Sequence, residues 1–162
     1  MENQLSRLES ALEDANKARA DLYLAFFAAI EKRLGREGAI AILKEAIRDW
    51  GKGLGRGLKG CSITDLPALF AVQPDGGKLF QPRIDRLDEA GFDVQFEACP
   101  LKKRWIEAGL SDGDIALFCR IAAEADYGTL EAAGFDVSIE CWKPGGTGCC
   151  SLRVRPPATV RS

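Results

Sequence analysis

The alternation of apolar and polar residues in the second half of the chain most constrains its fold. It runs through residues 92–98, 135–142 and 150–155. Strict alternation indicates strands with one face buried and the other in water. Residues 82–87 are expected to pair with the first of these strands, and the Gly-rich turn at residues 143–148 is expected to join the last two. The pattern predicts a small antiparallel sheet.

The first sixty residues show helical spacing instead. Apolar side chains recur every three or four positions over residues 5–34 and again over residues 37–50. Gly35 is expected to end the first of these helices. Shorter helices are predicted over residues 64–70, 100–108 and 112–125, the last after the capping pair Ser111 and Asp114.

These elements predict an α+β fold, with a helical N-terminal half packed on the sheet and helices inserted between the strands. The length of 162 residues fits one domain. We expect it to span residues 1–155, with the helical part at 1–60 and the sheet and candidate site at 78–155. Residues 156–162 are expected to be a mobile tail.

The chain contains no histidine, which excludes a Ser-His-Asp triad, a Cys-His dyad and a His-ligated metal. Its 22 Lys+Arg against 24 Asp+Glu give no basic surface for nucleic acid. The longest apolar run, residues 22–30, is too short to cross a membrane. Because the N-terminus does not resemble a signal peptide, we expect a cytoplasmic protein, in which the six cysteines stay reduced.

Five glycines alternate with basic residues over residues 51–60. One interpretation is a loop that cradles phosphate, but no strand precedes it and no Gly-Lys-Ser/Thr sequence ends it. The favoured alternative is the basic end of a helix that packs closely on a neighbour.

The helix after Ser111 carries an apolar stripe that ends in a carboxylate. Helical spacing places Ile115, Phe118, Cys119 and Asp126 on one face. A carboxylate at the end of a buried stripe needs a hydrogen bond, a cation or a proton, so Asp126 is a candidate functional residue. The alternative is that Asp126 only caps the next turn.

Strand alternation turns Cys141 and Cys150 toward the core and Cys149 away from it. Cys99 comes at the end of a strand, just before a helix that begins with proline. One interpretation is that the N-terminus of that helix lowers the pKa of Cys99 and makes it nucleophilic, and the alternative is that its thiol only packs in the core. Cys61 is interpreted as packing, like Cys149, and the role of Cys141 stays open.

These residues carry a resemblance to the L-2-amino-thiazoline-4-carboxylic acid hydrolase family. The resemblance covers most of the chain, and its specific part is an ordered set of a Cys-Pro pair, Cys-x6-Asp and a late Cys in the last strand. In this sequence the set consists of Cys99-Pro100, Cys119 with Asp126, and Cys150. Here two cysteines, Cys149 and Cys150, stand where one is expected, and strand alternation favours Cys150.

Membership would imply hydrolysis of a small cyclic isothiourea such as 2-amino-thiazoline-4-carboxylate to a carbamoyl-cysteine. Carried over by motif, the catalytic residues would be Cys99, Cys119, Asp126 and Cys150. We expect Asp126 to bind the amidinium of the substrate while the thiolate of Cys99 or Cys119 attacks C2 or positions water. No cofactor is expected.

Two other classes of site stay open. Zinc held by Cys99, Cys119 and Cys150, with Asp126 as fourth ligand or base, would make a metal hydrolase or lyase. A non-catalytic sensor of small molecules, resembling vinyl-reductase-like domains, would leave Asp126 solvated and far from every cysteine. Leucines near the N-terminus would suit pairing with a second copy, so a homo-oligomer through this helix is also an open expectation.

Overall fold

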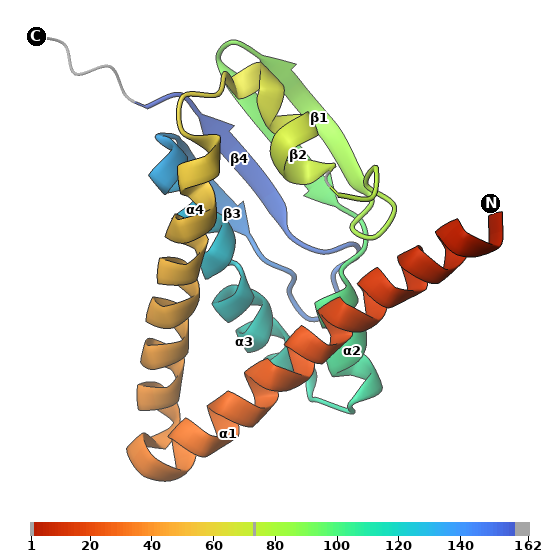
Figure 1. The fold of residues 1–162 in the computed structure, drawn as a ribbon. Coiled ribbons are helices and arrows are strands. Elements are labelled where there is room, and N and C mark those ends of the chain that lie inside the picture. Colours follow the sequence, from red (N-terminus) through yellow and green to blue (C-terminus); the bar gives the residue numbers. More distant parts are fainter. Residues whose placement is uncertain (1, 73, 158–162) are drawn as a thin grey trace, which may run out of the picture.

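The computed structural model describes residues 2–72 and 74–157 and has the expected α+β fold (Figure 1). Its helices are α1 (Glu2–Gly55), α2 (Pro100–Glu107), α3 (Asp112–Ala122) and α4 (Glu124–Ala133). Its strands are β1 (Pro82–Asp88), β2 (Gly91–Phe96), β3 (Asp136–Glu140) and β4 (Ser151–Arg155). Short helical turns at Arg56–Leu58, Ile63–Asp65 and Pro67–Ala71 link α1 to the sheet.

Helix α1 is bent into two arms at Gly35. The backbone there has φ 74° and ψ 174°, which is not helical and favours glycine. The predicted break is therefore confirmed, although the second helix continues to Gly55 rather than to residue 50. The first arm, residues 2–34, crosses α2, and the second arm, residues 36–55, runs along α4 (Figure 1).

The sheet has the order β1-β2-β4-β3, and all neighbours are antiparallel. This arrangement confirms the predicted strands and both predicted hairpins. In the register, Phe92 lies opposite Val154, and Val94 lies opposite Leu152. All four side chains are fully or almost fully buried, so one face of the sheet is packed, as the alternation predicts.

Two apolar cores meet inside the molecule. The helical core joins both arms of α1 to α2 and α3 and includes Tyr23, Trp105 and Phe118. The sheet core joins β2 and β4 to α4 and to the turns at residues 63–71. Trp105 Nε1 donates to the carbonyl of Ala20 at 3.2 Å and so fixes α2 on the first arm.

The helix predicted over residues 112–125 ends earlier than expected. Helix α3 ends at Ala122, and a separate helix, α4, follows from Glu124. Gly128 disfavours a helix by intrinsic propensity, yet the second arm passes so close that a Cβ on Gly128 would lie 2.1 Å from the carbonyl oxygen of Arg48. Close packing between helices therefore explains a glycine in the middle of α4.

The glycines of the second arm serve the same contact. A Cβ on Gly51 would lie 2.2 Å from the Ala125 carbonyl oxygen, and one on Gly55 would lie 2.1 Å from that of Thr129. Gly51 and Gly55 belong to a helix that packs on α4, not to a phosphate-binding loop. The favoured interpretation of this glycine-rich segment is confirmed.

Within residues 2–72 and 74–157, no helix is long and apolar enough to cross a membrane. Leu5, Leu8, Leu22 and Phe26 on the first arm are exposed, and the homo-oligomer expected through this helix stays a prediction. Of the predicted mobile tail, residues 158–162 lie outside the described residues.

Candidate active site

Asp126 lies in the first turn of α4, and the second arm of α1 fixes that turn. The close contact of Gly51 with Ala125 holds the backbone one residue before Asp126. Thr129 Oγ1 donates to the Gly51 carbonyl at 3.1 Å and adds a polar contact between the same helices. The glycine-rich end of α1 therefore fixes the turn of backbone that carries Asp126.

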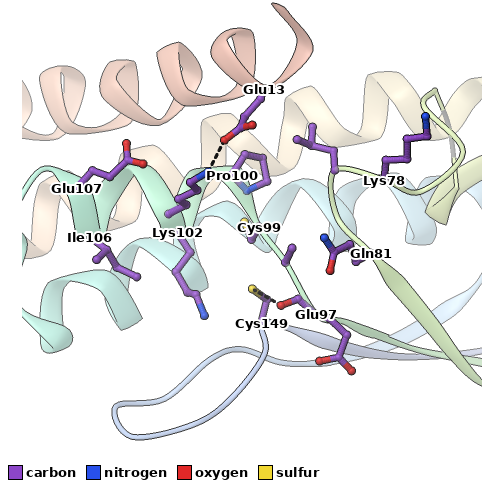
Figure 2. A pocket seen from close by; sticks show the side chains of 13 residues that line it. Glu13, Lys78, Gln81, Glu97, Cys99, Pro100, Lys102, Ile106, Glu107 and Cys149 are labelled. Carbon is purple, nitrogen blue, oxygen red and sulfur yellow. Dashed lines mark hydrogen bonds and ion pairs between the residues drawn. The ribbon is translucent and has the colours of Figure 1, made fainter. Parts of the chain in front are cut away.

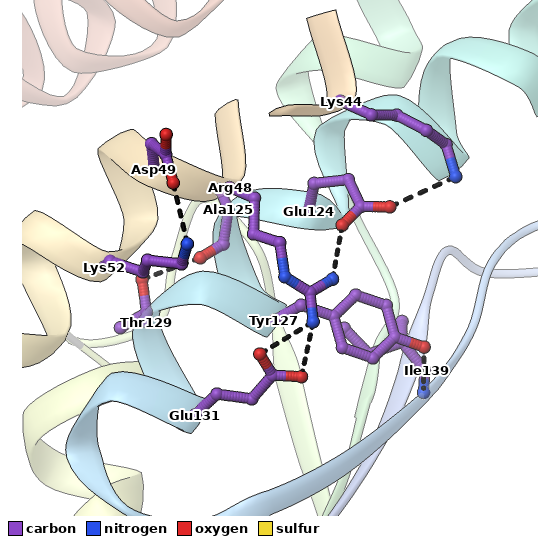
Figure 3. A network of polar contacts seen from close by, with 10 residues as sticks. All are labelled: Lys44, Arg48, Asp49, Lys52, Glu124, Ala125, Tyr127, Thr129, Glu131 and Ile139. Atoms are coloured by element: carbon purple, nitrogen blue, oxygen red, sulfur yellow. Dashed lines mark hydrogen bonds and ion pairs between the residues drawn. The ribbon is translucent and has the colours of Figure 1, made fainter. Parts of the chain in front are cut away.

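A network of ion pairs covers the opposite side of α4 (Figure 3). Arg48 donates to Glu124 at 2.7 Å and to both carboxylate oxygens of Glu131 at 2.6 and 2.7 Å. Lys44 pairs with Glu124 at 3.1 Å. Because residues two positions apart project to opposite sides of a helix, this network leaves Asp126 facing away from Arg48.

Tyr127 ties the same turn of α4 to the sheet. The Arg48 guanidinium lies over the Tyr127 ring, 5.2 Å from its centre, and the Tyr127 hydroxyl accepts the backbone N–H of Ile139 at 3.2 Å. The residues on both sides of Asp126 are thus fixed between the second arm and β3. Such support restricts how far the carboxylate can move.

Asp126 itself has no compensating partner. Within the described residues, its carboxylate makes no hydrogen bond and no ion pair within 4 Å. Some of the residue remains accessible to solvent, but burial of the carboxyl group raises the pKa of Asp126 to about 7. The positive charge of Arg19 opposes that rise without cancelling it. A carboxylate in this state can exchange a proton near neutral pH.

The predicted site residues come together where the two cores meet. Cys99 and Cys119 pack in the helical core and Cys150 packs against the sheet core. Cys119 interacts electrostatically with Cys99 and Cys150, and Asp126 interacts with Cys150. The four residues selected from the sequence therefore share one region, contributed by the end of β2, α3, α4 and the segment before β4.

The expected lowering of the Cys99 pKa is wrong. Cys99 precedes α2 as predicted, and backbone N–H groups of Lys102 and Leu101 do favour its thiolate. Burial outweighs them and raises the pKa of Cys99 to about 12. Burial also raises the pKa of Cys119. Both thiols are therefore protonated at neutral pH.

Cys141, whose role the sequence leaves open, joins the same cluster. Its Sγ lies 3.7 Å from the carbonyl oxygen of Cys119. The Cys150 thiol hydrogen-bonds to Cys141, and this bond lowers the pKa of Cys141 while raising that of Cys150. Of the clustered thiols, Cys141 is the one whose thiolate is favoured by its surroundings.

A surface hollow of about 390 Å³ reaches the edge of this cluster. It opens between the start of α1, α2 and residues 78–81, and Cys99 and Cys149 are among its lining residues (Figure 2). The Cys149 thiol is buried and lies 3.8 Å from the Glu97 carbonyl oxygen. Cys119, Asp126 and Cys150 are not among the residues that line this hollow.

Two residues of this region were missed by sequence reasoning. Arg19 and Tyr23 lie on the inner side of the first arm, and both interact electrostatically with Asp126. Tyr23 also interacts with Cys99. A positive charge beside an apolar helix face was the available signal for Arg19, but its relation to Asp126 depends on the bend at Gly35.

The zinc alternative gains no support from the geometry. Within the described part of the chain, no group of three or more Cys, Asp or Glu side chains lies in an arrangement that could hold a metal ion. The predicted ligands Cys99, Cys119, Cys150 and Asp126 share a region without forming such a group.

Comparison with known proteins gives one family. Residues 15–154 match the family model described as L-2-amino-thiazoline-4-carboxylic acid hydrolase. The match includes all four predicted site residues as well as Arg19, Tyr23 and Cys141. The searches of curated proteins and of solved structures give no significant match.

Proposed function

Because the chain belongs to the L-2-amino-thiazoline-4-carboxylic acid hydrolase family, we propose that it opens a small cyclic isothiourea by hydrolysis. The substrate proposed is 2-amino-thiazoline-4-carboxylate, and the product is N-carbamoyl-cysteine. The observation that carries the proposal is Asp126: an unpaired carboxylate, buried beside thiols, on a turn that is fixed from both sides.

Asp126 suits two parts of this reaction. Its carboxylate can pair with the amidinium formed, in the protonated substrate, by C2, the ring nitrogen and the 2-amino nitrogen. With a pKa of about 7, it can also take a proton from water at neutral pH. Its interaction with Cys141 and Cys150 favours an enzyme over a sensor, for which Asp126 would be solvated and remote from cysteines.

The proposed reaction has two bond changes at C2. Water adds through its oxygen to C2 while one of its protons passes to Asp126. The bond from C2 to the ring sulfur then breaks with its electron pair on sulfur, and the hydroxyl on C2 becomes the urea carbonyl. The proton of that hydroxyl goes to the sulfur, and Asp126 releases its proton to solvent.

Water is favoured over a cysteine as the nucleophile. A pKa of about 12 leaves little Cys99 thiolate at neutral pH, and burial disfavours the thiolate of Cys119 in the same way. We propose that these protonated thiols shape the site around the ring. Asp126 then acts as the general base, because the chain contains no histidine that could take this role.

The test is turnover of 2-amino-thiazoline-4-carboxylate by the purified full chain, followed by mass spectrometry of N-carbamoyl-cysteine. Asp126→Asn keeps the size of the side chain and removes the base. We expect it to lower kcat/KM by about 100-fold or more, the usual contribution of a general base. Asp112→Asn is the matched control, because Asp112 is exposed in the first turn of α3. It should keep wild-type activity. Full activity of Asp126→Asn would refute the role of the carboxylate.

Cysteine variants decide between water and a thiolate. If water attacks C2, Cys99→Ala and Cys119→Ala should each keep turnover within about tenfold of wild type, since neither forms a bond to substrate. A covalent adduct of substrate on either thiol, seen by mass spectrometry of the trapped enzyme, would contradict attack by water.

A further inference from the structure

Arg19 is a cation without an ionic partner in the structure. Its Nε is buried and has no hydrogen-bond partner, and within residues 2–72 and 74–157 its guanidinium forms no ion pair within 4 Å. Its neighbour is the ring of Trp50, whose centre lies 5.8 Å from Cζ. Trp50 belongs to the second arm of α1, so this contact joins the two arms. A buried donor with no acceptor costs free energy unless a ligand supplies one.

Asp126 is the opposite charge that faces the same region. Arg19 attracts it, and the attraction acts against the effect of burial. The two groups nevertheless do not meet in an ion pair, whereas Arg48 and Glu124 approach to 2.7 Å on the other side of α4. Arg19 and Asp126 therefore present a positive and a negative group to one region without neutralising each other.

Tyr23 connects these two charges with the thiols. It is buried one turn of helix after Arg19, and it interacts electrostatically with Arg19, Asp126 and Cys99. Its ring is stacked on Trp105 in the helical core, with centres 6.2 Å apart. The region between Arg19 and Asp126 thus lies beside the cluster of cysteines.

We propose that Arg19 is the residue that recognises the anionic group of the substrate, while Asp126 takes its cationic group. The ligand class is a small zwitterion with a carboxylate next to an amidinium-bearing ring. This inference rests on the proposed function for the identity of the ring. A carboxylate would accept two parallel hydrogen bonds from the guanidinium, including one from the buried Nε. The cation–π contact with Trp50 keeps the guanidinium in position.

The experiment measures binding calorimetrically for two ligands that differ in one group, 2-amino-thiazoline-4-carboxylate and 2-amino-2-thiazoline. The second has the same ring without the carboxylate. The proteins are the wild type, Arg19→Met, Arg19→Lys and the control Arg33→Met. Arg33 is exposed on the same arm, so its variant removes one positive charge from the same helix.

The wild type is expected to bind the carboxylate ligand about 100-fold more tightly than its analogue, as two hydrogen bonds between charged groups would give. Arg19→Met should reduce that ratio to about threefold, chiefly by weakening the carboxylate ligand. Arg19→Lys keeps the charge but loses the two-pronged geometry, and it should leave an intermediate ratio. Arg33→Met should match the wild type.

Equal weakening of both ligands by Arg19→Met would show a structural role and overturn the inference. So would a wild type that does not distinguish the two ligands, including one that binds neither. Circular dichroism of Arg19→Lys and Arg19→Met establishes that each variant is folded.

Turnover separates this inference from the proposed function. If the carboxylate ligand binds in an Arg19-dependent way but its ring is not opened, the hydrolase proposal fails and the role of Arg19 stands. If the ring is opened equally fast by wild type and Arg19→Met at low substrate concentration, the role of Arg19 fails and the hydrolase proposal stands.

Discussion

Glu124 and Asp126 are two carboxylates on one turn of α4 with opposite surroundings. Glu124 receives Lys44 and Arg48, whereas Asp126 receives no ion pair or hydrogen bond among the described residues. Arg19 attracts Asp126, but no ion pair forms between them. The ion pairs on the Glu124 side hold α1 and α4 together, and the proposal assigns ligand binding to the Asp126 side.

Isosteric amides should have opposite effects on stability at these two positions. Glu124→Gln removes a carboxylate that is only 12% exposed and leaves Arg48 and Lys44 with weaker partners, so it should lower the free energy of unfolding by about 1–2 kcal/mol. Asp126→Asn removes a charge that burial disfavours. It should raise the free energy of unfolding at pH 8, on the order of a few kcal/mol.

The pH dependence of stability shows, independently of a single measurement at pH 8, whether the Asp126 charge destabilises the fold. The pKa of Asp126 is about 7 in the folded protein against an ordinary value of 3.8. Between those pH values the folded state binds more protons than the unfolded state, so the contribution of Asp126 to stability falls as pH rises and is constant above about pH 7. Urea unfolding of wild type and Asp126→Asn at pH 5 and pH 8 measures this. A stability difference that does not grow from pH 5 to pH 8 would contradict it.

The contact between Gly51 and Ala125 fixes the turn of α4 that carries both Glu124 and Asp126. In Gly51→Ala the new Cβ would lie 2.2 Å from a backbone oxygen, so α1 and α4 must separate. We expect a loss of about 1–3 kcal/mol in the free energy of unfolding, with lower turnover because Asp126 moves. Gly57→Ala is the control, since a Cβ there would meet nothing within 4 Å. Thermal unfolding that is the same for both variants would show that the close contact is unimportant.

The smallest expected effect concerns Cys141. Cys150→Ala removes the hydrogen bond that lowers the pKa of Cys141, so that pKa should rise and alkylation of Cys141 by iodoacetamide at pH 8 should slow severalfold. Cys61→Ala is the matched control, because the groups that shift the pKa of Cys61 include Asp65 and none of the clustered thiols. Peptide mass mapping reads the rate at Cys141. An unchanged rate in Cys150→Ala would show that the two thiols do not interact.

The sequence predicted most of the fold because its patterns are local. Alternation located β2, β3 and β4, and Gly35 marked the bend in α1. Helix α4 was missed because glycine at position 128 suggests a turn. Glycine is needed at this position of the helix because the backbone of Arg48 passes too close for a side chain. That contact is between segments far apart in the chain, so no local pattern reveals it.

The sequence predicted which residues lie in one region of the fold, but not their electrostatics. The predicted single stripe through Cys119 and Asp126 is wrong, because Cys119 lies in α3 and Asp126 in α4. Asp126 nevertheless interacts electrostatically with Cys150. For Cys99 the N-terminus of α2 does act to lower the pKa, as predicted, but burial in the helical core raises it by more. Arg19 was missed because its position opposite Asp126 arises only when the bent α1 packs around α2, α3 and α4.

The most direct test is the titration of Asp126 itself, followed by the ¹³C chemical shift of its carboxyl carbon in the folded protein. Asp126→Asn identifies the signal. We expect a midpoint near pH 7, because burial without a compensating partner disfavours the charged form. A midpoint near the ordinary pKa of 3.8 would show a solvated or paired carboxylate and would contradict the proposed role of Asp126 as a base at neutral pH.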